Sequence, residues 1–72
     1  MRRGLGSSEP LLVDLQVVIL RSSERAVLVE PLTTGREAAW VPLSMVELSP
    51  NEDGRSHQMT IPEWLANDKA LL

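Results

Sequence analysis

Apolar and polar positions alternate over residues 11–21, just after a polar start to the chain. Asp14 and Gln16 stand between apolar residues, which is the period-two pattern of a half-buried strand. The branched side chains of residues 17–19 also suit a pleated surface better than a helix. The segment is therefore predicted to be a strand with one apolar face, formed by Leu11, Val13, Leu15, Val17 and Ile19.

Four further short strands are predicted after this one. Residues 22–25 form a polar break of hairpin length, so residues 25–30 are expected to pair antiparallel with the first strand. Pro31 ends that second strand by removing a ladder donor, and Gly35 suits a turn that needs positive φ. The remaining strands are expected at residues 37–41, 45–49 and 56–60, with a turn at residues 51–54.

The end of the chain changes to a helical pattern. Thr60 and Glu63 are spaced as a capping box, and Pro62 is tolerated in a first helical turn. The sequence therefore predicts a mainly β fold: a small five-stranded antiparallel barrel or strongly bent sheet, with one C-terminal amphipathic helix. We expect the helix to dock on its own barrel, with a neighbouring subunit as the alternative. Its apolar stripe consists of Ile61, Trp64, Leu65, Leu71 and Leu72.

Trp40 and Trp64 are the only aromatic residues other than His57, because the chain has no Tyr and no Phe. Both tryptophans are expected to anchor the core, so loss of Trp40 is predicted to unfold the domain. Ser44 is expected to bond a backbone amide in a tight corner after Pro42. This corner resembles that of Src-homology-type small barrels, although the aromatic groove of those domains has no counterpart here.

Composition and charge restrict the class of protein. Residues 1–10 combine glycine, serine and charge and are expected to form a flexible tail, which leaves residues 11–72 as one domain. The chain contains no cysteine, which fits a reducing cytoplasm. The apolar run 11–20 is about half the length of a transmembrane helix, and the start lacks a signal-peptide pattern, so a cytoplasmic location without a membrane span is expected.

No residue pattern predicts an enzyme, a metal site or a cofactor. His57 is the only histidine, whereas a zinc site needs three or four ligands. A calcium loop beginning at Ser49 fails, because Thr60 falls where a bidentate glutamate is required. The default interpretation is a solvated strand histidine and an ordinary turn.

Arginines provide the remaining candidate site. Arg21 and Arg25 flank the first hairpin turn and Arg36 lies in the next loop, so a small basic patch of these three on the barrel rim is one interpretation. The favoured interpretation is that they are solubilising turn residues beside Glu24 and Glu37. The net charge of −3 favours a protein partner over DNA, and leaves weak binding of single-stranded nucleic acid as the alternative function. Trp64 completes the set of candidate binding residues.

A broader resemblance covers most of residues 11–72. The motifs are residues 24–29 (ERAVLV), residues 40–42 (WVP) with Ser44, and residues 61–66 (IPEWLA). In this order they resemble small, largely uncharacterised bacteriophage and prophage proteins, although Leu43 stands where that pattern commonly has lysine. The resemblance implies a non-enzymatic accessory role, in which the chain binds a protein partner near DNA replication or recombination.

Overall fold

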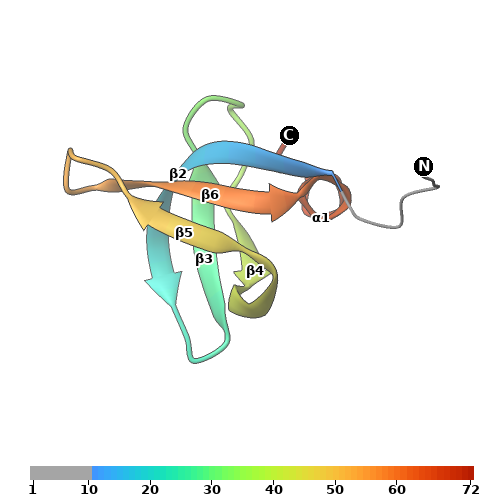
Figure 1. The fold of residues 1–72 in the computed structure, drawn as a ribbon, viewed down its shortest axis with the longest axis horizontal. Coiled ribbons are helices and arrows are strands. Elements are labelled where there is room, and N and C mark those ends of the chain that lie inside the picture. The colour runs from blue at the N-terminus through green and yellow to red at the C-terminus, as the bar shows by residue number, and fades with distance from the viewer. Residues whose placement is uncertain (1–10) are drawn as a thin grey trace, which may run out of the picture.

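A computed structural model describes residues 11–72; the predicted tail, residues 1–10, lies outside the described residues. The predicted mainly β fold with one C-terminal helix is confirmed over this range. All five predicted strands are present, and β4 leads into a short 3-10 helix, η1 (Figure 1). The elements are β2 (Leu12–Ser22), β3 (Ala26–Pro31), β4 (Ala39–Pro42), η1 (Leu43–Met45), β5 (Glu47–Pro50), β6 (Ser56–Pro62) and α1 (Glu63–Asp68).

The strands form one antiparallel sheet in the order β4-β3-β2-β6-β5. β4 and β5 are its two edges, so the sheet is not closed and a barrel is not supported. Both edge strands have four residues and end in a proline, Pro42 and Pro50. A short strand whose last residue lacks an N–H is a poor partner for another strand, which explains why the two edges do not pair.

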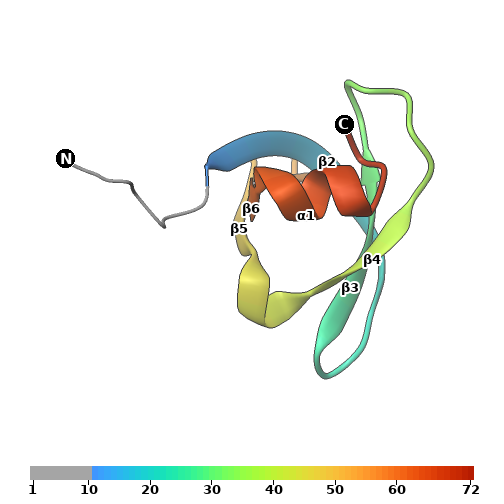
Figure 2. The same ribbon diagram turned by 90° about the vertical axis from the view of Figure 1, so that its right-hand side faces the viewer.

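The sheet bends sharply because β2 belongs to both of its halves. Residues 12–18 of β2 pair with β6, and residues 17–22 pair with β3. A β-bulge between Ile19 and Arg21 leaves Leu20 without a partner and increases the local bend. Figure 2 shows β2 arching over the molecule, with β5 and β6 on one side and β3 and β4 on the other. The two halves therefore enclose a core between them.

The core comes from the inner side of the sheet and from the C-terminal segment. Leu15 and Val17 are buried as the alternation predicts, and Val13 and Ile19 pack against them. Leu11 is the exception on this face, because it precedes β2 and is 71% exposed. The buried apolar residues are Leu15, Val17, Val27, Val29, Val41, Met59, Ile61, Leu65, Ala66 and Leu71. They come from β2, β3, β4, β6 and the C-terminal segment, so both halves of the sheet share one core.

α1 docks on its own sheet, as expected. Leu65 and Ala66 are buried in the same cluster as Met59 and Ile61, and α1 lies over one open end of the bent sheet (Figure 2). The predicted capping box is wrong, because Thr60 is still in β6. Its hydroxyl donates to Asp14 instead, at 2.6 Å.

The helix ends in a left-handed turn that sends Leu71 back into the core. Ala70 has φ of 57°, and the N–H groups of Ala70 and Leu71 donate to the carbonyls of Asn67 and Ala66 at 3.0 and 2.8 Å. These two bonds define a Schellman motif, in which glycine is the usual left-handed residue. Leu71 is fully buried beyond this turn. The left-handed Ala70 thus reverses the chain after a six-residue helix and allows Leu71, three residues beyond the helix, to pack in the core.

Replacing Ala70 with glycine is expected to stabilise the protein. The left-handed conformation costs alanine about 1–2 kcal/mol, which glycine avoids. Glycine loses about 0.5–1 kcal/mol more conformational entropy on folding than alanine, which offsets part of this gain. Ala70→Gly should therefore raise the free energy of unfolding by about 0.5–1 kcal/mol, measured by urea denaturation. The control is Asp68→Gly at the last residue of α1, which should not raise the same free energy, because glycine is no better than aspartate as a helix former. A lower stability for Ala70→Gly would show that position 70 is not strained.

Candidate functional site

The outer side of the sheet changes character between its two halves. On β5, β6 and the first part of β2 it is polar, with Asp14 and Thr60 bonded across two strands. We call this half the outer polar face; its members are Asp14, Gln16, Glu47, Ser49, Gln58, Thr60 and the buried Ser56. Such a surface is normal for the solvated side of an antiparallel sheet.

A hydrogen-bond network at the β5–β6 turn continues the outer polar face. The Asn51 side-chain amide donates to Gln16 at 2.6 Å and to the Ser56 hydroxyl at 2.8 Å. Asp53 accepts the backbone N–H groups of Arg55 and Ser56, both at 2.9 Å, and the Ser56 hydroxyl at 2.7 Å. The backbone bond from Ser56, followed by that from Arg55, lowers the pKa of Asp53 from 3.8 to about 2. The network closes the turn predicted at residues 51–54.

The other half of the outer side is apolar. Trp40 on β4 is paired with Leu28 on β3, and Leu28 is paired with Arg21 on β2. Leu20 lies in the bulge beside Arg21, and Val18 lies two residues before Leu20 on β2. Val18, Leu20, Leu28 and Trp40 form what we call the outer apolar face. Leu20 and Trp40 are exposed, and Val18 and Leu28 are partly buried. Adjacent apolar residues on the outer side of a sheet are typical of a surface that binds another molecule.

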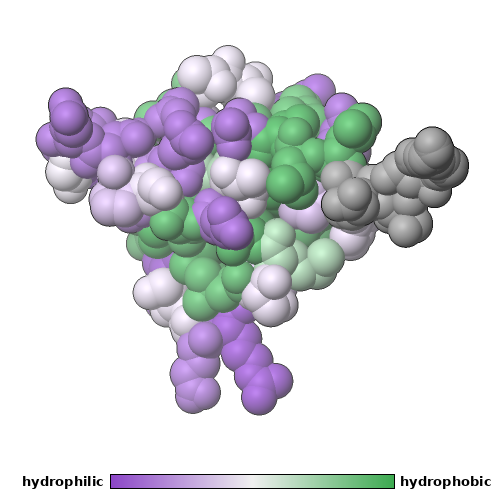
Figure 3. Space-filling model, viewed as in Figure 1, coloured by the Kyte–Doolittle hydropathy of each residue, from purple (hydrophilic) through white to green (hydrophobic). Residues whose placement is uncertain are grey.

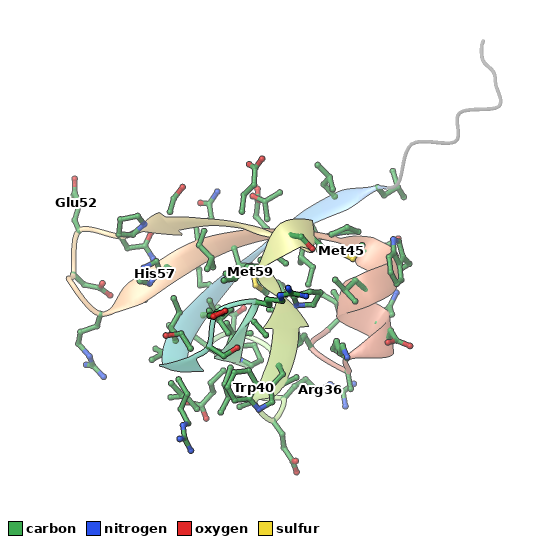
Figure 4. All side chains as sticks on the ribbon, turned by 90° about the horizontal axis from the view of Figure 1, so that it is seen from below. Arg36, Trp40, Met45, Glu52, His57 and Met59 are labelled. Carbon is green, nitrogen blue, oxygen red and sulfur yellow. The ribbon has the colours of Figure 1, made fainter. Side chains whose placement is uncertain are left out.

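Trp40 is not a core residue, so that prediction is wrong. Its side chain is 44% exposed, whereas the next residue, Val41, is fully buried. Figure 4 shows Met59 between the two halves of the sheet and Trp40 at the far side of β4. The physical reason is strand parity: Val41 faces the core, so residue 40 must face outward. Because Trp40 is outside the core, its loss is no longer expected to unfold the domain.

Prolines restrict strand addition at both sheet edges. Leu43 N–H donates to Arg25 at 2.8 Å, so the alternation of an antiparallel ladder turns the backbone of Trp40 and Pro42 away from β3. Pro42 has no N–H to offer at this outward position. The same argument applies to Pro50 on β5, because Asn51 N–H donates to Ser56 at 3.0 Å. Each edge strand therefore lacks one outward N–H that an added strand would need. The outer side of the sheet is a better binding surface than either edge.

The three candidate arginines do not come together. Arg21 is exposed beside the outer apolar face and Arg25 is exposed in the β2–β3 turn at the same end of β3. Arg36 lies in the β3–β4 loop at the opposite end, where its Nε donates to the Leu72 carbonyl at 2.7 Å. Thr34 in the same loop donates to the Leu71 carbonyl at 2.9 Å. Arg36 therefore helps to hold the loop before β4 to the C-terminal segment.

Trp64 contributes to a second apolar surface, away from the outer apolar face. It is 53% exposed on α1, whereas Leu65 beside it is buried, so it is not the core anchor predicted from the helical stripe. The Leu11 carbonyl accepts the Glu63 N–H at 2.8 Å, and Leu12 pairs with Pro62. Figure 3 shows apolar side chains gathered over this end of β2 and β6. Leu12 also lines a shallow pocket with Ser44, Met45, Val46, Glu47 and Thr60.

His57 is partly buried on β6, between Val17 of β2 and Pro50 of β5. Its Nδ1 has no hydrogen-bond partner within the described residues. Residues 11–72 contain no group of three or more His, Cys, Asp or Glu side chains placed to hold a metal ion. In the same range, no helix combines the length and apolar character needed to cross a bilayer.

No family model, curated protein or solved structure gave a significant match to this chain. The description of the site therefore depends on its geometry. The sequence analysis missed the outer apolar face because it assigned Trp40 to the core and gave Leu28 no face. The available signal was their parity: Leu28 stands between two inward valines, and Trp40 stands next to inward Val41.

Acid is expected to weaken the β5–β6 turn through Asp53. The folded-state pKa is about 2 against an ordinary 3.8, so the stabilisation is complete above pH 4 and is lost as pH falls towards 2. An NMR titration of the Asp53 carboxyl should give a midpoint at least one unit below 3.8. Asp53→Asn should remove the part of the acid dependence of unfolding that arises at this site. The control Glu52→Gln removes a charge from the same turn and should leave the low Asp53 midpoint in place.

Proposed function

We propose that this protein acts without catalysis, by binding a protein partner through the outer apolar face. The observation that carries the proposal is the exposure of Trp40 beside Leu28 on a sheet surface whose other half is polar. Tryptophan surrounded by aliphatic side chains is characteristic of binding hot spots. Hydrogen bonds from Thr34 and Arg36 hold the loop that leads into β4, so Trp40 is presented on an ordered strand.

The resemblance to phage and prophage proteins supports a biological setting for this role. It rests on residues 24–29, 40–42 and 61–66, of which Trp40 and Trp64 are exposed and Val27, Val29 and Val41 are buried. We propose an accessory function in DNA replication or recombination, in the cytoplasm, where the chain contacts a protein of the complex. The net charge of −3 supports a protein partner in preference to nucleic acid.

A second candidate function is weak binding of single-stranded nucleic acid. The observation that favours it is the single row across three strands that contains Arg21, Leu28 and Trp40. An exposed tryptophan can stack on a base while a neighbouring arginine contacts a phosphate. Glu30 lies on the same outer side and opposes this function. Binding of a labelled oligonucleotide that weakens steeply with salt would support it, and no binding at low salt would exclude it.

The proposed function predicts that a single exposed side chain controls partner capture. Immobilised wild-type protein, Trp40→Ser and the matched control Trp64→Ser are each exposed to an extract of the source cells. We expect one partner to be retained by wild type and Trp64→Ser and lost with Trp40→Ser. With the purified partner, Trp40→Ser should raise the dissociation constant at least about tenfold.

Two measurements make this test decisive. Because Trp40 is on the solvent side, Trp40→Ser should keep a melting temperature within a few degrees of wild type. A variant that remains folded and still retains the same partner with unchanged affinity would overturn the proposal. Loss of retention with Trp64→Ser alone would transfer the binding role to the surface around Leu11, Leu12 and Trp64.

A further inference from the structure

The outer apolar face carries both signs of charge at its border. Arg21 is opposite Leu28 on the neighbouring strand, and Glu30 is two residues beyond Leu28 on the same strand. Both charged residues are exposed. A surface with an apolar centre, one cation and one anion can complement itself, which is the requirement for a two-fold contact between identical chains.

The spacing of these residues fits a particular two-fold arrangement. Adjacent strands are about 4.8 Å apart and alternate residues of one strand about 6.8 Å apart, so Arg21 and Glu30 lie at similar distances from Leu28 in perpendicular directions. We place a two-fold axis between the two faces, parallel to both sheets, so that it passes over Leu28 and runs diagonally to the strands. A rotation about this axis exchanges the direction along the strands with the direction across them. It places Arg21 of each copy against Glu30 of the other, with Leu28 on Leu28 at the centre.

The same axis gives Trp40 an apolar partner. Trp40 is one strand from Leu28 on the side away from Arg21, so the rotation brings it over the second copy's Ala26, which precedes Leu28 by two residues. The strands of the two sheets then cross at nearly a right angle, which is one of the two standard packings of sheet on sheet. All four apolar members of the face lie at or beside this contact.

Other ways of joining two copies are less favourable. Pairing of β4 edges to extend the sheet would place Pro42 at an outward position that needs a donor. With the strands of the two copies aligned, a two-fold axis along the strands would bring Glu30 of one copy against Glu30 of the other. An axis across the strands would bring Arg21 against Arg21. The small size of the domain, 62 described residues around a thin core, also makes added apolar burial valuable.

We propose that the partner of the outer apolar face is a second copy of this chain, bound sheet on sheet across this diagonal two-fold axis. This inference rests on the proposed function, because it requires the outer apolar face to bind protein. The four apolar residues of this face are few beside the roughly 20–30 residues that each side of a standard interface contributes, so the dimer is expected to be reversible and to form in the micromolar range.

The experiment measures the mass of the purified full chain by light scattering and sedimentation over a range of concentrations. Wild type should change from 8.0 kDa at low concentration to twice that mass at high concentration. Trp40→Ser should raise the dimer dissociation constant at least about tenfold, while Trp64→Ser leaves it unchanged. Each exposed charge is then reversed alone, as Arg21→Glu and Glu30→Arg, and both are reversed together.

The double reversal is the decisive arm, because it exchanges the charges while keeping the pairing. Each single reversal should weaken the dimer about tenfold, and the double variant should return to within about threefold of wild type. Single reversals without effect, or a double variant weaker than both, would overturn the diagonal arrangement. Melting temperatures of all variants control for folding.

The two proposals fail in different ways. Wild type that stays monomeric at every concentration overturns the dimer, and the proposed function still stands if Trp40→Ser abolishes partner capture. A wild-type dimer that Trp40→Ser leaves intact also overturns the dimer through this face. Monomeric wild type together with unchanged capture by Trp40→Ser overturns both proposals.

Discussion

The rest of the structure depends on the double pairing of β2. One strand of eleven residues hydrogen-bonds to β6 along its first part and to β3 along its second. The bulge at Leu20 allows the second part to turn away from the first, so that the sheet folds over its own apolar side. Without this bend the inward residues of β3 and β6 would form one flat surface, and α1 would have no enclosed end to cover.

The bend also divides the outer side into two surfaces that face different directions. On the first, polar side chains satisfy one another, as in the contact between Asp14 and Thr60. On the second, Leu28 and Trp40 are cross-strand neighbours, and the Trp40 side chain is 44% exposed. Both surfaces belong to the same sheet and the same solvent, so the difference between them is not a consequence of the fold. The binding role proposed for this face would account for apolar residues at these positions.

Much of the fold followed from the sequence, because its information is local. The alternation in residues 11–21, the polar breaks and the prolines located every strand to within a few residues. Local patterns do not show whether a single large apolar residue faces the core or the solvent. Trp40 and Trp64 are predicted to be core residues from size and from helical spacing, but their neighbours Val41 and Leu65 occupy the inward positions. Closure of the sheet was equally beyond the pattern, because it depends on contact between two edges far apart in the chain.

The candidate site shows the same limit for charged residues. Arg21, Arg25 and Arg36 are close along the chain, but a strand separates the first two from the third. Arg36 and Thr34 instead hold the β3–β4 loop against Leu71 and Leu72. The left-handed turn at Ala70 that buries Leu71 thereby connects the end of α1 to the loop leading into β4. The order of the strand that carries Trp40 thus depends on the last residues of the chain, a link that no spacing in the sequence reveals.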